Sequence, residues 1–242
     1  MTILCIETST SVCSAAVCKD GAPGKQCISL EGSNHARLLP RYIEELLSYA
    51  RAEGLSIDAV ALSEGPGSYT GLRIGTSTAK GLCYGLNIPL IPIPTLAVLC
   101  EAARKQMPET SLSRPHVLVP MIDARRMEVY TEVERDEVQG TKKNGACAVV
   151  VESEESLYQG EEDVYYFGDG AAKCETVLRK PNWHFMPGIV PEAQYMGELA
   201  EAQADGSSDE KGGLTGEQIA YYEPYYLKEF VAAQSHVKGL KS

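Results

Sequence analysis

The stretch Ser63-Glu64-Gly65-Pro66-Gly67-Ser68-Tyr69-Thr70-Gly71 joins two runs of different periodicity. The apolar run 57–63 before it predicts a β-strand, and the run 71–85 after it predicts an α-helix. A glycine-rich turn at the start of a helix can hold an anion with free backbone N–H groups and the positive end of the helix dipole. It is not a P-loop, because Gly71 is followed by Leu72 and Arg73, and its spacing differs from the dinucleotide fingerprint. A tight structural turn and an anion site therefore stay open as alternatives.

The residues on either side of this turn predict an α/β domain. Strands are expected at 3–6, 12–18, 25–30 and 88–93, and helices at 34–52 and 95–105. Ser33 or Asn34 is placed to cap the first helix, and Pro40 fits only in the first turn of a regular helix. We therefore expect the regular part of that helix to begin near Pro40. The order of elements favours a mixed sheet with helices packed on it.

A second unit begins like the first. The apolar run 117–122 ends in Asp123 and a polar turn, as the run 3–6 ends in Glu7 and a polar turn. This likeness predicts a duplicated domain, continued by strands at 127–133, 146–151 and 164–167 and a helix at 192–204. Residues 205–213 are expected to form an exposed loop. We predict a first lobe of residues 1–105, completed by 217–242, and a smaller second lobe of residues 106–216, with the end of the tail fraying.

Charge and cysteine usage limit the partners and the compartment. The 33 acidic and 22 basic residues give a net charge of −11, so the chain should not hold nucleic acid by itself. The eight cysteines include no Cys-x-x-Cys pair, and the first residues resemble a strand and not a signal peptide. No apolar run approaches the ~20 residues that span a bilayer. We therefore expect a cytoplasmic chain that meets neither a membrane nor, directly, an RNA.

The predicted helix 71–85 is unusually rich in glycine, with Gly71, Gly75, Gly81 and Gly85. These glycines together cost on the order of 3–4 kcal/mol of helix stability relative to alanine. Close approach of another element would offset that cost. The approaching element can belong to a partner or to the same domain, and the sequence does not separate these alternatives.

Other patterns indicate little chemistry. Glu7 and Asp123, at strand ends, can line a nucleotide cleft, but acids are common in turns. The four histidines show no i, i+4 pair, and no Gly-x-Ser-x-Gly elbow is present. No catalytic residue and no metal ligand is predicted.

Several segments together resemble the TsaB family, also called YeaZ. They are 3–21, His35-Ala36-Arg37-Leu38-Leu39-Pro40, 61–82 with its Gly-Pro-Gly-Ser-Tyr-Thr-Gly-Leu-Arg-Ile-Gly run, 88–96, Ile122-Asp123-Ala124-Arg125 and Pro224-Tyr225-Tyr226-Leu227. The resemblance implies a two-lobed actin-like ATPase fold of the sugar kinase and heat-shock chaperone class, each lobe RNase H-like. It also implies a non-catalytic subunit of the machinery that transfers threonylcarbamoyl to the adenosine beside the anticodon of tRNAs reading ANN codons.

The resemblance further implies partners and sites. The partners are a catalytic TsaD-like subunit, a TsaE-like ATPase, a second copy of the chain when it is alone, and tRNA only through the complex. The metal ligands of the catalytic paralogue, His-x-x-x-His, align with Thr95 and Leu99, neither of which can replace imidazole. The implied partner interface comprises His35, Leu39, Tyr42, Ile43, Leu46, Thr70, Leu72, Arg73, Gly75, Thr76, Lys80 and Tyr84.

A nucleotide or anion cleft is the remaining predicted site. Its residues would be Glu7, Thr8, Ser9, Gly65, Gly67, Ser68, Gly71 and Asp123. No cofactor is required by this chain, and weak ATP or ADP binding at a subunit interface stays open. A glycoprotease-like metallopeptidase and a stand-alone actin-fold kinase or ATPase are the alternative functions.

Overall fold

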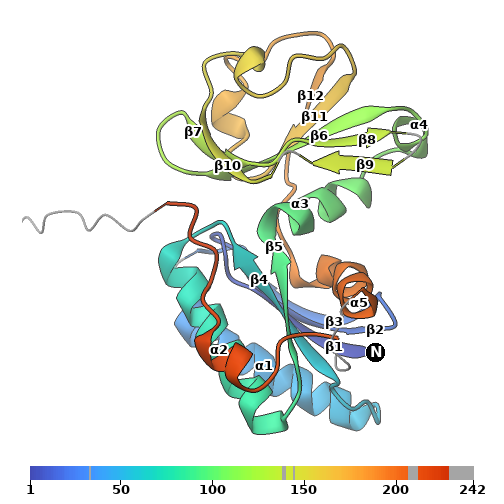
Figure 1. Ribbon diagram of the computed structural model, residues 1–242, viewed down its shortest axis with the longest axis vertical. Coiled ribbons are helices and arrows are strands. Elements are labelled where there is room, and N and C mark those ends of the chain that lie inside the picture. Colours follow the sequence, from blue (N-terminus) through green and yellow to red (C-terminus); the bar gives the residue numbers. More distant parts are fainter. Residues whose placement is uncertain (33, 138–139, 144, 207–211, 229–242) are drawn as a thin grey trace, which may run out of the picture.

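The computed structural model describes the chain apart from residues 33, 138–139, 144, 207–211 and 229–242. Two lobes lie one above the other, each built around a β-sheet, and α3 (Thr95–Arg104) runs between them (Figure 1). Buried residues of α3, including Leu96 and Leu99, share a core with Leu118 and Phe167 of the second lobe. The two lobes are therefore joined by apolar packing and not by a linker alone.

The first lobe has a five-stranded sheet with the order β3-β2-β1-β4-β5. The strands are β1 (Thr2–Glu7), β2 (Cys13–Lys19), β3 (Ala22–Ser29), β4 (Ala59–Gly65) and β5 (Leu90–Pro94). The first three are antiparallel, and β1, β4 and β5 are parallel. α1 (His35–Ala52) and α2 (Tyr69–Leu86) cover one face, and later segments of the chain cover the other, which explains why β1 and β4 are buried almost throughout.

The second lobe repeats this topology. Its main sheet has the order β10-β7-β6-β11-β12, with β6 taking the central place of β1. The pairs β6–β7 and β7–β10 are antiparallel, and β6, β11 and β12 are parallel. The strands are β6 (His116–Asp123), β7 (Glu128–Thr131), β10 (Cys147–Val150), β11 (Asp163–Phe167) and β12 (Trp183–Met186). The duplication predicted from the two acid-ended strands is confirmed.

Shorter elements complete the second lobe. The hairpin of β8 (Glu134–Glu137) and β9 (Gly140–Lys143) pairs with the first half of β6. α4 (Glu109–Leu112) precedes β6, and two 3-10 turns, η1 (Glu154–Ser156) and η2 (Ala172–Cys174), flank β11. Among the residues that the structure describes, every helix is too short or too polar to cross a lipid bilayer.

The first helix differs from the prediction at its start. α1 begins at His35, so Pro40 lies inside the regular helix and not at its beginning. Because proline has no N–H, the carbonyl of Ala36 cannot receive the regular i, i+4 bond at this point. Asn34 occupies the cap position but makes no side-chain capping bond, and residue 33 lies outside the described residues.

The chain returns to the first lobe earlier than the predicted boundary of residue 216. η3 (Ala193–Met196) and α5 (Gly197–Asp205) pack on the face of the first sheet opposite α1 and α2. Ala193, Met196 and Ala200 are buried there with Ile3 and Cys5. The physical reason is that this apolar face of the first sheet needs cover, to which α3 contributes only Val98 among the described residues of the cluster.

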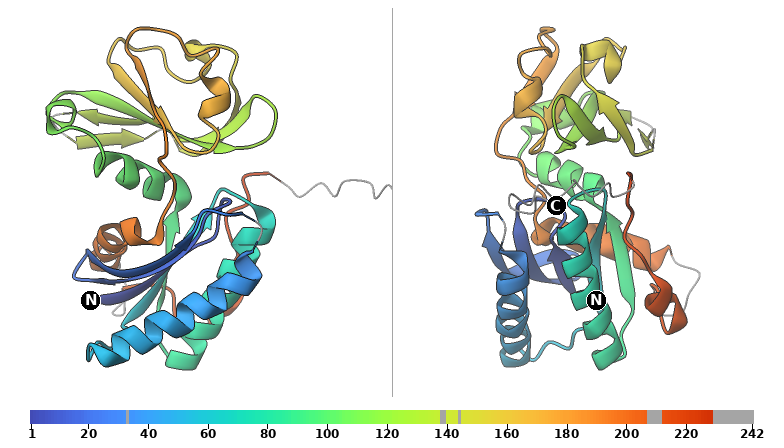
Figure 2. Two further views of the ribbon diagram at one scale, coloured as in Figure 1. Left: turned by 180° about the vertical axis from the view of Figure 1, so that it is seen from behind. Right: turned by 90° about the vertical axis from the view of Figure 1, so that its left-hand side faces the viewer.

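The last described segment also belongs beside the first lobe. Leu214 exchanges backbone hydrogen bonds with Leu90, and α6 (Glu217–Tyr221) buries Ile219 against the core under α2. Residues 222–228 then rise beside α2 toward the second lobe (Figures 1 and 2). The predicted exposed loop and frayed tail lie largely outside the described residues.

Candidate functional site

Two equivalent acids end the central strands of the two lobes. Glu7 ends β1, and its Oε1 accepts the backbone N–H of Ser9 at 2.6 Å and the Ser9 hydroxyl at 2.5 Å. Asp123 ends β6, and its Oδ1 accepts the backbone N–H of Arg125 at 3.0 Å. Each acid thus closes the polar turn that follows it by binding the amide two residues on. The same local chemistry occurs in both halves of the duplicated fold.

The two acids nevertheless have different environments. The Glu7 side chain is completely buried, and desolvation raises its pKa to about 7, although hydrogen bonds from Ser9 and Ser63 oppose the shift. Asp123 is half exposed and pairs with the Lys173 ammonium. Near neutral pH, Glu7 therefore exists as a mixture of acid and carboxylate, which makes it a poor permanent anchor for a metal–phosphate complex.

A third acid, Asp169, was not predicted from the sequence. It follows β11 in Gly168-Asp169-Gly170, and its Oδ1 accepts the backbone N–H of Asp123 at 2.9 Å. Desolvation, and then the charge of Asp123, raises its pKa, and its charge in turn raises the pKa of Glu7. The signal in the sequence was the glycine pair directly after an apolar strand. The structure shows why a glycine stands there, because a Cβ on Gly168 would lie 2.3 Å from the Met121 carbonyl oxygen.

The glycine-rich turn is pressed against the turn that follows β1. A Cβ on Gly67 would lie 2.2 Å from the Ser9 carbonyl oxygen, and one on Gly71 would lie 2.0 Å from that of Thr8. The Ser68 amide donates to the Ser9 carbonyl at 2.6 Å, and the Ser68 hydroxyl accepts the Gly71 amide at 3.3 Å. These amides are engaged within the chain, so the geometry favours the tight structural turn, while the anion cleft stays a prediction.

The positions that align with the paralogue's metal ligands are closed. Thr95 is fully buried, and its hydroxyl lies 2.7 Å from that of Ser63, in hydrogen-bond contact. Leu99 is also fully buried, in the apolar contact with Leu118 and Phe167. Across the described part of the chain, no group of three or more histidine, cysteine, aspartate or glutamate side chains is arranged to hold a metal ion.

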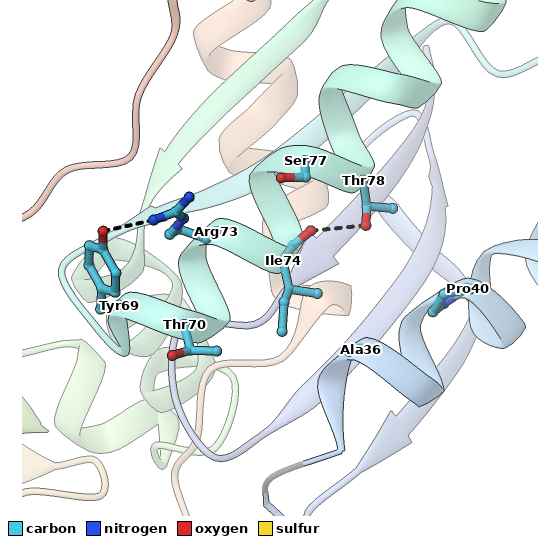
Figure 3. Close-up of a pocket in the computed structure, with 8 residues that line it drawn as sticks. All are labelled: Ala36, Pro40, Tyr69, Thr70, Arg73, Ile74, Ser77 and Thr78. Atoms are coloured by element: carbon cyan, nitrogen blue, oxygen red, sulfur yellow. Dashed lines mark hydrogen bonds between the residues drawn. The ribbon is translucent and has the colours of Figure 1, made fainter. Parts of the chain in front are cut away.

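A groove of about 510 Å³ lies between α1 and α2 on the outer surface of the first lobe (Figure 3). Ala36 and Pro40 line it from α1, and α2 supplies Tyr69, Thr70, Arg73, Ile74, Ser77 and Thr78. Arg73 donates to the Tyr69 hydroxyl at 2.9 Å, and its guanidinium carbon lies 5.4 Å from the centre of the Tyr69 ring. One end of the groove therefore carries an aromatic side chain with a fixed cation.

The structure divides the predicted interface residues into two sets. Thr70, Arg73 and Tyr84 are exposed, Tyr84 to 90%, and Tyr42 and Lys80 are half-buried. The others are buried inside this chain, where they face the sheet and not a partner: His35, Leu39, Ile43, Leu46, Leu72, Gly75 and Thr76. Both helices lie on the surface of the first lobe, and their apolar spacing marks the faces that pack against the sheet.

The four glycines of α2 divide in the same way. A Cβ on Gly75 would lie 2.3 Å from the Thr8 hydroxyl, so Gly71 and Gly75 allow α2 to approach the first sheet. No atom of the described residues lies within 4 Å of a Cβ on Gly81 or Gly85, which face away from the fold. Packing within the domain therefore accounts for the first pair, and only the second pair is open to a partner.

The sequence also gave no sign of how the last described residues contact the glycine-rich turn. The Tyr225 amide donates to the Glu64 carbonyl at 2.8 Å, and the Tyr226 ring lies 5.0 Å from that of Tyr69. Lys228 pairs with Glu128 of the second lobe. This segment thus supports one wall of the groove and bridges the lobes.

The comparisons agree with this fold. The family model of TsaD, tRNA N6-adenosine threonylcarbamoyltransferase, matches residues 29–196. A TsaB of Haemophilus influenzae, a tRNA threonylcarbamoyladenosine biosynthesis protein, is 31% identical over 211 residues, covering 84% of this chain and 86% of the relative. The Escherichia coli protein of the same description is 35% identical over 138 residues, 57% of either chain. YeaZ from Pseudomonas aeruginosa has a solved structure with a TM-score of 0.72 at 26% identity, covering 93% of this chain and 99% of that one.

The duplicated lobes, with acids at the ends of their central strands, define a protein of the actin-like ATPase fold class. Within that class, the chain belongs to the TsaB (YeaZ) family of tRNA threonylcarbamoyladenosine biosynthesis proteins.

Proposed function

We propose that this chain is a non-catalytic subunit of the complex that transfers threonylcarbamoyl to the adenosine beside the anticodon, and that it docks a TsaD-type catalytic subunit on the α1–α2 groove. The observation that carries the proposal is the groove itself. It is about 510 Å³, lies on the outside of the first lobe and is lined mainly by exposed or half-buried side chains of two neighbouring helices.

The chemistry of the groove suits a helical partner. Ala36, Ser77 and the open positions of Gly81 and Gly85 present little side-chain bulk, so a second helix can approach closely. Arg73 and Tyr84 supply the exposed cation and aromatic ring that dominate many interfaces. The buried residues of α1 and α2 act indirectly, by holding the two helices in place.

A scaffold role also fits the closed paralogue site. Thr95 and Leu99 offer one neutral hydroxyl and a hydrocarbon where the catalytic paralogue has two imidazoles, and both are engaged in the core. The proposal assigns the reaction to the partner and requires no cofactor of this chain, with ATP or ADP bound weakly, if at all, at a subunit interface. A TsaE-type ATPase would join the pair, tRNA would bind through the complex, and the chain alone would form a homodimer through the same groove.

A bulky side chain placed in the groove tests this docking proposal. Ser77→Trp should weaken binding of a TsaD-type subunit at least about tenfold, because the indole occupies the space of the partner helix. Ala202→Trp is the matched control, since Ala202 is also an exposed small residue of a helix, on the opposite face of the first sheet. Affinity is measured by titration calorimetry after thermal unfolding confirms that both variants fold.

A cellular readout separates the pathway from the interface. Loss of the gene should abolish threonylcarbamoyladenosine in bulk tRNA, and Ala202→Trp but not Ser77→Trp should restore it. Unaltered binding by Ser77→Trp would refute the groove, and normal modified nucleoside after gene loss would refute the function. Turnover of ATP or of a polypeptide by the isolated chain would instead favour the kinase or peptidase alternatives.

A further inference from the structure

A second hollow, of about 210 Å³, lies in the second lobe where β6 and β11 begin. His116 and Asp163 are the first residues of these parallel strands and are register partners in the sheet. The segment that leads into β6 closes the hollow with Thr110, Ser111 and Arg114. Because the acids Glu7 and Asp123 stand at the opposite, carboxyl ends of their strands, this hollow is separate from the predicted nucleotide or anion cleft.

The walls of the hollow are held by specific contacts. The Tyr165 hydroxyl donates to the Ser111 hydroxyl at 3.0 Å, which ties β11 to the segment before β6. His116 Nδ1 lies 2.8 Å from the Arg114 carbonyl oxygen. The Tyr165 ring stands between two imidazoles, edge-on to that of His116 at 6.0 Å and tilted over that of His184 at 5.0 Å. These contacts fix Ser111, Tyr165 and the backbone of Arg114 before any ligand arrives.

The free groups of the hollow are hydrogen-bond donors. Arg114 is exposed and forms no ion pair among the residues that the structure describes, and the Thr110 hydroxyl makes no hydrogen bond there either. The one carboxylate in the lining, Asp163, already contacts His184 Nε2 at 3.0 Å. A guanidinium with up to five N–H groups and a hydroxyl that line the same hollow are suited to an oxyanion.

The size of the hollow limits the ligand. At about 210 Å³ it is smaller than the ~300–1,000 Å³ of sites that hold nucleotide-sized or drug-sized molecules. A phosphate group with part of its hydration shell fits such a space. We propose that this hollow binds a phosphate group, through Arg114 and Thr110, either as inorganic phosphate or as the head of a small phosphate monoester.

The site is tested on the full chain by ¹H–¹⁵N NMR titration with inorganic phosphate and, in a separate arm, glycerol phosphate, at constant ionic strength set with chloride. We expect saturable shifts confined to residues 110–116 and 163–165, with Kd in the millimolar range. Arg114→Gln should weaken binding about tenfold or more, and Thr110→Val by a smaller factor. Arg179→Gln, at another exposed arginine of the same lobe, is the matched control and should bind as the parent chain does.

The two arms identify the source of the phosphate. Tighter binding of inorganic phosphate supports a free ion, and tighter binding of glycerol phosphate supports a monoester. Shifts that do not saturate, that spread over basic residues generally, or that survive Arg114→Gln would overturn the site. Equal loss in Arg179→Gln would also overturn it, because binding would then reflect charge alone.

Discussion

The same substitution at two glycines of α2 should have opposite effects on stability. In Gly75→Ala, the new Cβ would lie 2.3 Å from the Thr8 hydroxyl and 3.1 Å from a methyl carbon of Leu62. Thr8 can relieve the clash only by turning away, which breaks its buried hydrogen bond to the Gly71 carbonyl, now 2.9 Å long. In Gly81→Ala, the new Cβ has no atom within 4 Å in the part of the chain that the structure describes.

The magnitudes follow from these contacts. Overpacking costs about 1–3 kcal/mol, and a buried hydroxyl left without its bond costs about 1–3 kcal/mol. Alanine recovers about 1 kcal/mol of helix propensity at either position. Gly75→Ala should therefore lower the free energy of unfolding by roughly 1–5 kcal/mol, and Gly81→Ala should raise it by up to about 1 kcal/mol.

Thermal unfolding followed by circular dichroism measures both changes. For a chain of this size, 1 kcal/mol shifts Tm by about 2–4 °C, so the two variants should move in opposite directions from the parent. A neutral or stabilising Gly75→Ala would refute the close approach of α2 to the first sheet. The result also bears on bulkier changes, since Gly75→Leu should disrupt the fold itself and so cannot test an interface.

Two further perturbations test the acid and the contact between the lobes. Because burial raises the pKa of Glu7 from about 4.5 to about 7, the folded state binds more protons between these values, so stability falls as pH rises through this window, by about 3 kcal/mol in all. Glu7→Gln should remove that component. Urea unfolding should then show that the variant loses less stability between pH 5 and pH 8 than the parent chain does. An equal pH dependence in the two chains would contradict the assignment. Leu99→Ala should lower the free energy of unfolding by roughly 2–5 kcal/mol and speed limited proteolysis between the lobes, since Leu99 is fully buried against the second lobe. Leu112 is exposed, so Leu112→Ala is the control, and an equal cost in both variants would count against this contact.

Much of the fold could be predicted because its signals are local. Apolar runs and glycine-rich turns placed β1, β4, α2 and α3 within a few residues of their observed bounds. The repeated acid at the end of a central strand predicted the duplication, because residues 7 and 123 each close a turn with nearby amides. Pro40 was misleading, because a proline is tolerated inside α1 where its side of the helix is exposed.

The candidate site could be predicted only in part. The apolar spacing of α1 and α2 identified helices with one face against a core, but the residues chosen from it, such as Leu39 and Leu46, are the ones that the core buries. Asp169 could not be predicted, because what places it in the site is its hydrogen bond with the backbone amide of Asp123, 46 residues earlier in the chain. The hollow around Arg114 was not predicted for a similar reason, since Asp163 and Tyr165 line it from β11, about fifty residues later in the chain.

The sequence by itself determined the order of elements, the duplication, the family and the glycine-rich turn between strand and helix, because neighbouring residues and periodic patterns specify these features. Only the tertiary structure decided what that turn and its helix do. At 100° per residue, Gly71 and Gly75 share one side of α2 and Gly81 and Gly85 share another. Packing against Thr8 turned the first pair inward and left the second pair open. The reason that Gly71 and Gly75 must be glycine lies in contacts with Thr8, more than sixty positions earlier in the chain.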